Sequence, residues 1–380
     1  MIYVTSILSI MLPFFTFPIV CIGFFMDKKH KFKYLLLLAL ILSMYAYTLD
    51  AKEGLDLSVY FGQMKSISHL SVSKFFISLK EISEPLFRIL LYYIARIGDY
   101  HILPMIATFI IYSIYFFIIY DYYKENKFKD KYLTISVISI LILFRYLYTI
   151  SGIRNPLAIS LFAIIFYYDV YKNRGTKVIL LYIIPFLIHN SIILLVLIRI
   201  ILLLIFNRKT KFKYIINITI VVLFLIFLNL LLNTDIFIDR GAYFSETYRS
   251  SFSLFENKGF LVQQILHILF ISINYNNYKR TKDRKYLIIN IFNIIIIVLG
   301  QIYFFIFDRY FQLMILFNIL SMIDYMSINQ VKFNIRICII YVCLTFFLLS
   351  QIISITSADF LIEKNIFNNI PRIIYEVTRI

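Results

Sequence analysis

Long apolar segments alternate with short polar stretches along the whole chain. An α-helix needs about 20 mostly apolar residues to cross the hydrocarbon core of a bilayer. The segments that meet this requirement, or come close to it, are residues 3–25, 34–49, 102–120, 132–149, 156–171, 214–232, 259–276, 286–306, 310–328 and 337–356. Two more flank a turn expected at His189 and Asn190, between the polar stretches 172–177 and 207–213. The pattern predicts an all-α, polytopic integral membrane protein with about twelve transmembrane helices.

The positive charges are concentrated in a few of the polar stretches. More than half of the 38 Lys and Arg residues lie in residues 27–33, 121–131, 172–177, 207–213, 278–285 and 329–336. Cytoplasmic loops of membrane proteins carry the excess of Lys and Arg, so we expect all of these stretches on the cytoplasmic side. An even number of crossings must then separate each of them from the next. This parity places both termini outside.

The expected outer segments hold the polar residues that membrane orientation does not explain. The predicted organisation is a single transmembrane domain over residues 1–380, with external loops at about 50–101 and 233–258. Within the first loop, residues 85–97 are mostly apolar but too short to span a bilayer, and Pro85 suits the first turn of a helix. We expect a short interfacial or re-entrant helix there.

Composition supports the membrane class and excludes several others. Hydrophobic residues make up 61% of the chain, charged residues 16%, and the mean hydropathy is +0.83. The formal net charge of +17 does not indicate a nucleic-acid partner, because the Lys and Arg lie in short loops between apolar segments. Membrane lipids are the expected surroundings. Cys21, Cys338 and Cys343 lie in apolar segments without metal-ligand spacing, so neither a disulfide nor a metal site is expected.

Arginines on the expected outer side carry the clearest chemistry. Arg154 lies in the turn between the fourth and fifth spans, Arg145 lies shortly before it, and Arg309 follows Asp308 at the end of the tenth. Planar guanidinium groups bind phosphate oxygens bidentately, so these side chains can hold a pyrophosphate. Other roles stay open: lipid headgroups for Arg154, a tyrosine or carbonyl for Arg145, and mutual neutralisation for the Asp308–Arg309 pair.

Acidic and histidine side chains on the same side offer groups for proton transfer. His189, at the apex of the expected hairpin, could act as a base near neutral pH or be a hydrogen-bonded structural residue. Asp56 and Tyr60 share a face if their stretch is helical, which places a carboxylate beside an aromatic ring, a common arrangement for holding a sugar. Glu84 could take part in the same chemistry or cap the helix that begins at Pro85.

Taken in order, these motifs resemble the EpsG family, a branch of the Wzy-type polymerases that join lipid-linked oligosaccharide repeats into O-antigen, capsule or exopolysaccharide. The matching residues are Gly54-x-Asp56 with Tyr60, Glu84-Pro85-x-Phe87, Arg154-Asn155, His189-Asn190-Ser191 and Arg309-Tyr310-Phe311. Family members often have Arg-Gln-x-x-Ala where this chain has Arg154-Asn155-Pro156-Leu157-Ala158, so the amide side chain is shorter and a proline is added.

The resemblance implies glycosyl transfer on the outer leaflet of a bacterial cell membrane, without a cofactor, a metal or a nucleotide sugar. A glycan on polyprenyl pyrophosphate would be the donor and an incoming lipid-linked repeat the acceptor. The residues that would bind the leaving pyrophosphate are Arg154, Arg309 and Arg145. The candidates for positioning or deprotonating the acceptor hydroxyl are Asp56, Glu84 and His189. The expected sugar contacts are Tyr60 and Asn155. A flippase and a chain-length regulator are expected partners.

Two other functions share some of these features. A flippase for lipid-linked oligosaccharide would have a similar number of helices and cationic cavities, but it should consist of two similar halves, which this sequence does not contain. An O-antigen ligase uses similar chemistry on the outer face and stays open as an alternative.

Overall fold

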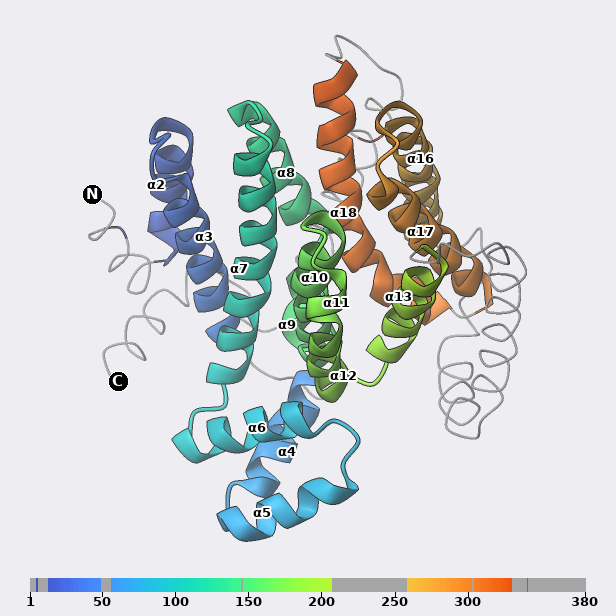
Figure 1. Cartoon of the computed structure of the whole chain (residues 1–380). Helices are drawn as coiled ribbons and strands as arrows, with labels where there is room; N and C mark the ends of the chain where they lie inside the picture. Colours follow the sequence, from blue (N-terminus) through green and yellow to red (C-terminus); the bar gives the residue numbers. More distant parts are fainter. Residues whose placement is uncertain are drawn as a thin grey trace. The chain divides into compact units, whose positions relative to one another are not determined.

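The computed structural model describes residues 5, 13–48, 56–144, 146–206, 258–302, 304–329 and 340. All regular elements in this part of the chain are helical, which confirms the all-α class for it. In chain order the helices are α2 (Pro13–Met26), α3 (Lys31–Tyr47), α4 (Asp56–Ile67), α5 (Val72–Ser78), η1 (Leu79–Glu81), α6 (Pro85–Ile97), α7 (Ile102–Glu125), α8 (Asp130–Leu143), α9 (Tyr146–Ser151), α10 (Arg154–Phe166), η2 (Tyr167–Tyr171), α11 (Gly175–Val178), η3 (Ile179–Tyr182), α12 (Ile183–Ile188), α13 (Ile192–Phe206), α16 (Lys258–Thr281), α17 (Arg284–Ile302) and α18 (Phe304–Asn329) (Figure 1).

Two described segments are long and apolar enough to cross a membrane, namely Ile102–Glu125 and Arg309–Ile328. Shorter apolar helices occur at Thr16–Met26, Ile179–Ile188 and Ile192–Leu203. The expected span 214–232, the expected loop before Lys258, and all of 337–356 except Ile340 lie outside the described residues. The number of about twelve spans and the outer position of the termini therefore stay predictions.

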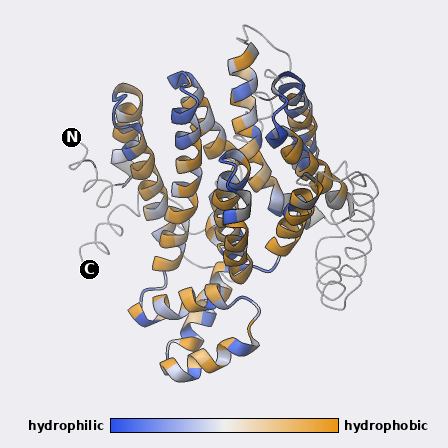
Figure 2. Cartoon of the chain, viewed as in Figure 1, coloured by the Kyte–Doolittle hydropathy of each residue, from blue (hydrophilic) through white to orange (hydrophobic). Residues whose placement is uncertain are grey.

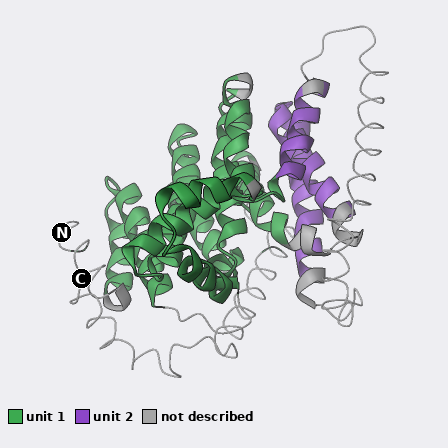
Figure 3. Cartoon of the chain, turned by 90° about the horizontal axis from the view of Figure 1, so that it is seen from below, with its two compact units in different colours: residues 1–192, 309–380 green, residues 193–308 purple. Residues whose placement is uncertain are grey.

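The described residues form two compact units (Figure 3). One comprises Met1–Ile192 with Arg309–Ile380, and the other comprises Ile193–Asp308. In the second unit α16 packs against α17, and the amide of Asn290 donates a hydrogen bond to the carbonyl of Ile271 at 3.1 Å. Polar side chains that bond across neighbouring helices are a common way to join helices in an apolar environment.

The first unit is built around an antiparallel pair, α3 and α7. At one end the ring of Phe32 stacks on Tyr120, with 5.1 Å between centroids. At the other end the Tyr47 hydroxyl donates to the Asp99 carboxylate at 2.7 Å, just before α7 begins. Both helices are apolar around most of their circumference, as is typical of helices buried in protein or lipid (Figure 2).

Ion pairs gather three of the basic stretches at one end of this unit. Lys31 at the start of α3 lies 2.9 Å from Asp130 at the start of α8. Lys172 lies 2.8 Å from Asp121 and 2.5 Å from Glu125, both in the last turns of α7. The hydrophilic turns α2–α3 and α7–α8 are both seen at the top of Figure 2. This common location is what the positive-inside interpretation requires of loops 27–33, 121–131 and 172–177.

Three short helices, α4, α5 and α6, lie at the opposite end of the same unit, below α7 in Figure 1. The predicted short helix at residues 85–97 is confirmed with the same bounds. Pro85 occupies the first turn, where its missing N–H is not needed, and Gly98 ends the helix in the left-handed region at φ 93°. The ring of Phe75 in α5 stacks on Tyr92 in α6 at 3.9 Å, so the short helices pack as one layer.

Two expected segments are divided differently from the prediction. The expected span 132–149 is interrupted, because α8 ends at Leu143 and Phe144 adopts an extended conformation. This break lets the buried Phe144 ring pack on Tyr115, with 4.4 Å between centroids. The expected end of the tenth span at Asp308-Arg309 is wrong, since α18 already begins at Phe304 and both residues lie within its first turns.

Candidate functional site

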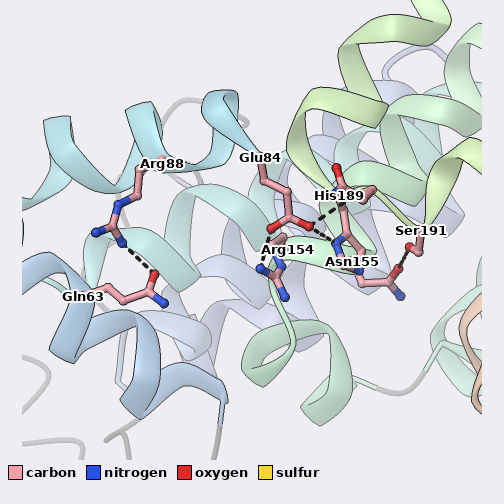
Figure 4. A network of polar contacts seen from close by, with 8 residues as sticks. Gln63, Glu84, Arg88, Arg154, Asn155, His189 and Ser191 are labelled. Carbon is pink, nitrogen blue, oxygen red and sulfur yellow. Dashed lines mark hydrogen bonds and ion pairs between the residues drawn. The ribbon is translucent and has the colours of Figure 1, made fainter. Parts of the chain in front are cut away.

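Glu84 lies at the centre of a cluster contributed by three separate parts of the first unit (Figure 4). It occupies the N-cap position of α6, but its side chain makes no capping hydrogen bond. Its Oε2 instead lies 2.5 Å from a terminal nitrogen of Arg154, and its Oε1 lies 2.6 Å from Nδ1 of His189. The backbone N–H of Asn190 also donates to Oε1, at 3.2 Å. Of the two roles left open for Glu84, capping is therefore excluded.

Ionisation of Glu84 is set by these neighbours. Burial would raise its pKa, but the hydrogen bond from His189 and the positive charge of Arg154 outweigh that effect, so the pKa of Glu84 lies below its usual value. The carboxylate is therefore ionised at neutral pH. An ionised carboxylate only accepts hydrogen bonds, so Nδ1 of His189 must carry the proton.

His189 lies at the expected turn, which the structure confirms. Helix α12 ends at Ile188, His189 is extended, and α13 begins at Ile192. Burial lowers the pKa of His189, the Glu84 carboxylate raises it, and the charges of Arg154 and Arg309 lower it; the net effect is a pKa below the usual histidine value. The ring is thus neutral near pH 7. Its Nε2 then keeps a lone pair and can accept a proton.

Arg154 is the first residue of α10, directly after the short turn that follows α9. The expected turn is confirmed, and the side chain is 36% exposed. One terminal nitrogen binds Glu84, whereas the buried Nε has no hydrogen-bond partner within the described residues. Gly152 allows this turn to pack closely, because an added Cβ would lie 3.2 Å from the carbonyl oxygen of Tyr148 and 3.7 Å from the Asp56 carboxylate.

A second layer of hydrogen bonds fixes the Arg154 and His189 turns relative to each other. The amide of Asn155 donates to the Tyr148 hydroxyl at 2.9 Å and accepts from the Ser191 hydroxyl at 3.3 Å. The Tyr310 hydroxyl, on α18, donates to the carbonyl of Ser191. Asn155 is buried, so its amide connects parts of the protein, and the sugar contact expected for it stays a prediction.

Asp56 and Tyr60 lie beside this cluster, on α4. Their stretch is helical, as the expected sharing of a face requires. Tyr60 is buried with its ring edge-on to Phe87 at 5.2 Å, and its hydroxyl interacts electrostatically with both Arg154 and Glu84. Asp56 is exposed at the start of the helix. Both side chains are thus near Arg154, and their roles toward a sugar stay predictions.

The structure therefore brings together most of the candidates that the sequence suggests. Arg309 lies close enough to His189 for its charge to affect the ring. Arg145 lies outside the described residues. Two neighbours were not anticipated, Arg88 on α6 and Gln63 on α4, whose side chains are hydrogen-bonded at 3.0 Å (Figure 4). The signal that could have found Arg88 is its place in a short apolar helix, one turn after Glu84.

The site has a limited set of chemical capabilities. It combines a guanidinium group, an ionised carboxylate and a neutral imidazole, which suit anion binding and proton transfer. No group of three His, Cys, Asp or Glu side chains in the described ranges is arranged to hold a metal ion.

Comparison with known proteins identifies the family. No curated protein and no solved structure matches this chain. The family model described as the EpsG family matches residues 33–368, which is most of the chain and includes every residue of the site described above. The protein therefore belongs to the EpsG family.

Proposed function

We propose that this protein is a membrane glycosyltransferase that polymerises lipid-linked oligosaccharide repeats. The donor is a growing glycan on polyprenyl pyrophosphate, and the acceptor is an incoming repeat on the same kind of lipid. The reaction takes place at the outer leaflet of a bacterial cell membrane and yields O-antigen, capsule or exopolysaccharide. A flippase would supply the repeats, and a chain-length regulator would act on the product.

The observation that supports this proposal most is the Glu84 cluster. Arg154, His189 and Glu84 come from distant parts of the sequence and meet at the end of the unit opposite to the ion-paired basic loops. Glycosyl transfer from a pyrophosphate needs a group that stabilises the leaving anion and a group that accepts a proton. Arg154 and His189 supply groups of these two kinds. Membership of the EpsG family supports a role in polysaccharide biosynthesis at the membrane.

Arg154 and Arg309 are assigned to the leaving group. As the bond between the anomeric carbon and the pyrophosphate oxygen breaks, negative charge grows on the pyrophosphate. The Arg154 guanidinium has donors beyond the one that binds Glu84, so it can contact phosphate oxygens without releasing the carboxylate. Arg145 is assigned to the same group by sequence position alone.

His189 is assigned as the base for the acceptor. Its Nε2 takes the proton of the acceptor hydroxyl while that oxygen bonds to the anomeric carbon, and the proton then passes to solvent. Glu84 is a positioning residue, because it accepts from Nδ1 and so fixes the tautomer and the ring orientation. Asp56, Tyr60 and Asn155 are assigned to the sugars. A neutral, buried imidazole with an ionised partner supports this division of roles.

The test is elongation by the purified protein in nanodiscs. Given only polyprenyl-pyrophosphate-linked repeats of the native sugar, it should lengthen the glycan and release polyprenyl pyrophosphate without a nucleotide sugar or an ion gradient. Substitution His189→Ala should slow elongation by about 10²- to 10⁴-fold, whereas Asp56→Asn should slow it less. If the protein moves intact repeats between leaflets and lengthens none, it is a flippase and the proposal fails.

A further inference from the structure

The Glu84 cluster by itself carries no surplus positive charge. The charge of Arg154 is balanced by the ionised Glu84, and His189 is neutral at physiological pH. Asp56, beside Gly152, adds a further negative charge on the same side. Arg309, which lies close enough to His189 to affect its ring, adds one positive charge. A sugar-linked pyrophosphate is a dianion, so a site for it needs a further cationic group close to Arg154.

Arg88 lies one turn after Glu84 on α6. Unlike Arg154, it is hydrogen-bonded to a neutral side chain. Its backbone N–H donates to the carbonyl of Glu84 at 3.2 Å, so the two side chains lie on the same face of the helix (Figure 4). One terminal nitrogen of Arg88 donates to Oε1 of Gln63 at 3.0 Å, and the buried Nε has no hydrogen-bond partner in the described part of the chain. Lys31 and Lys172, by contrast, are both paired with carboxylates.

Gln63 therefore orients the Arg88 guanidinium without neutralising it. A neutral amide fixes one edge of the planar group and leaves the full charge and the other donors for a ligand. Gln63 lies on α4, one turn after Tyr60, and the Tyr60 hydroxyl interacts with Arg154. Arg88 and Arg154 thus border the same side of the α4–α6 layer.

We propose that Arg88 and Arg154 form a two-armed site for one lipid-linked pyrophosphate, each guanidinium binding one phosphate. The inference rests on the proposed function, since it names a further binding residue for the same substrate. Arg88 supplies the positive charge that Glu84 cancels at Arg154. The site therefore distinguishes a lipid pyrophosphate from a lipid monophosphate, which has no second phosphate for Arg88.

The test is direct binding to the purified full chain in phosphatidylcholine nanodiscs. Labelled polyprenyl pyrophosphate and polyprenyl monophosphate are titrated separately. Substitution Arg88→Gln should weaken binding of the pyrophosphate by about 10- to 100-fold, as expected for loss of hydrogen bonds between charged groups, and should change binding of the monophosphate little. Arg96, which is exposed on the same helix, provides the matched control. Substitution Arg96→Gln should leave both affinities unchanged.

A second variant keeps Arg88 and changes only its partner. Substitution Gln63→Glu places a carboxylate against Arg88, so it should weaken pyrophosphate binding as Arg88→Gln does, even if the latter variant does not fold. Wild-type affinity in a folded Arg88→Gln or Gln63→Glu protein overturns the two-armed site, as does an equal loss for both lipids. Elongation is measured in parallel. If the wild-type protein binds the pyrophosphate through Arg88 but lengthens no glycan, the proposed polymerase function is wrong and the binding site is still supported.

Discussion

Glu84 couples residues that lie 70 and 105 positions further along the chain. Its two carboxylate oxygens serve different partners, because Oε2 binds Arg154 and Oε1 binds His189 and the backbone of Asn190. An ionised carboxylate in this position keeps the arginine oriented and fixes the tautomer of the histidine. In the proposed function, Glu84 therefore acts through Arg154 and His189 rather than on the substrate itself.

The first prediction concerns the pH dependence of elongation. His189 must be neutral to accept a proton, and its pKa lies below the usual histidine value, so activity should fall only at pH below about 6.5. Glu84 raises this pKa and Arg309 lowers it. Glu84→Gln should therefore shift the acid limb to lower pH, and Arg309→Gln should shift it to higher pH. Initial rates between about pH 5 and pH 8 measure both.

The opposite signs provide the control for this prediction. A substitution that only damages the fold lowers the rate at every pH and does not move the limb. If both variants keep the wild-type limb, His189 is not the base.

The second prediction concerns the shape of the Arg154 side chain. In Arg154→Lys the ammonium can still pair with Glu84, but it cannot offer the other guanidinium donors in one plane. We expect most surface polymer to be lost while the protein accumulates normally in the membrane. Gels of surface polysaccharide and immunoblots of membranes measure the two quantities. Polymer at the wild-type level from Arg154→Ala would show that Arg154 only meets lipid headgroups.

Single residues were predictable from sequence as chemical types but not as partners. Arg154 was recognised because it interrupts an apolar stretch. His189 was recognised because it lies at an expected turn. Their common partner was not, since a contact across 70 or 105 residues depends on how the helices pack. Arg88 was missed for a similar reason, because the sequence of a short apolar helix does not show that Gln63 lies beside this arginine.

At the scale of elements, the layer of α4, α5 and α6 positions the site. Helix α6 carries Glu84 and Arg88, and α4 carries Asp56, Tyr60 and Gln63. The layer is held partly by the stack of Phe75 on Tyr92, both of them almost fully buried. Loss of this stack should therefore loosen the support of the site without removing any of its polar groups.

The third prediction tests this support. Substitution Phe75→Ala should destabilise the layer by about 3–5 kcal/mol, the usual cost of removing a buried phenylalanine ring. Hydrogen exchange should become faster in α5 and in the part of α6 around Tyr92, and should change little in α7. Phe76→Ala is the matched control, because the neighbouring ring is 44% exposed. Equal exchange in the two variants would mean that the Phe75 stack does not hold the layer.

Element boundaries were predictable where a local signal sets them. Pro85 and Gly98 mark the two ends of α6, and the structure places the helix between them. The break after Leu143 has no such signal, because the Phe144 ring is drawn into a contact with Tyr115, which is distant in sequence. The same limit applies to α18, which begins before the Asp308-Arg309 pair at which the tenth span was expected to end.

At the scale of the whole molecule, the first unit has two chemically different ends. Ion pairs of Lys31 and Lys172 gather basic loops at one end. Helix α3 runs from that end to the other, where α4 to α6 and the Glu84 cluster lie. The length of one helix, α3, thus separates Lys31 from the site. If the basic loops are cytoplasmic, the site must face the outer leaflet.

The fourth prediction tests this sidedness. In a background with Cys21→Ser, Cys338→Ser and Cys343→Ser, single cysteines are introduced at positions that are exposed on opposite ends of the first unit. Ser66→Cys, on α4, should react with an impermeant maleimide added to intact cells. Lys129→Cys, between α7 and α8, should react only after the membrane is permeabilised. The difference follows from the membrane barrier, since both side chains are accessible to water in the structure.

Lys28→Cys, in another basic loop, serves as a second inner position and should behave as Lys129→Cys does. If both lysine positions are labelled in intact cells and Ser66→Cys is protected, the site faces the cytoplasm. Polymerisation at the outer leaflet could not then occur at this site.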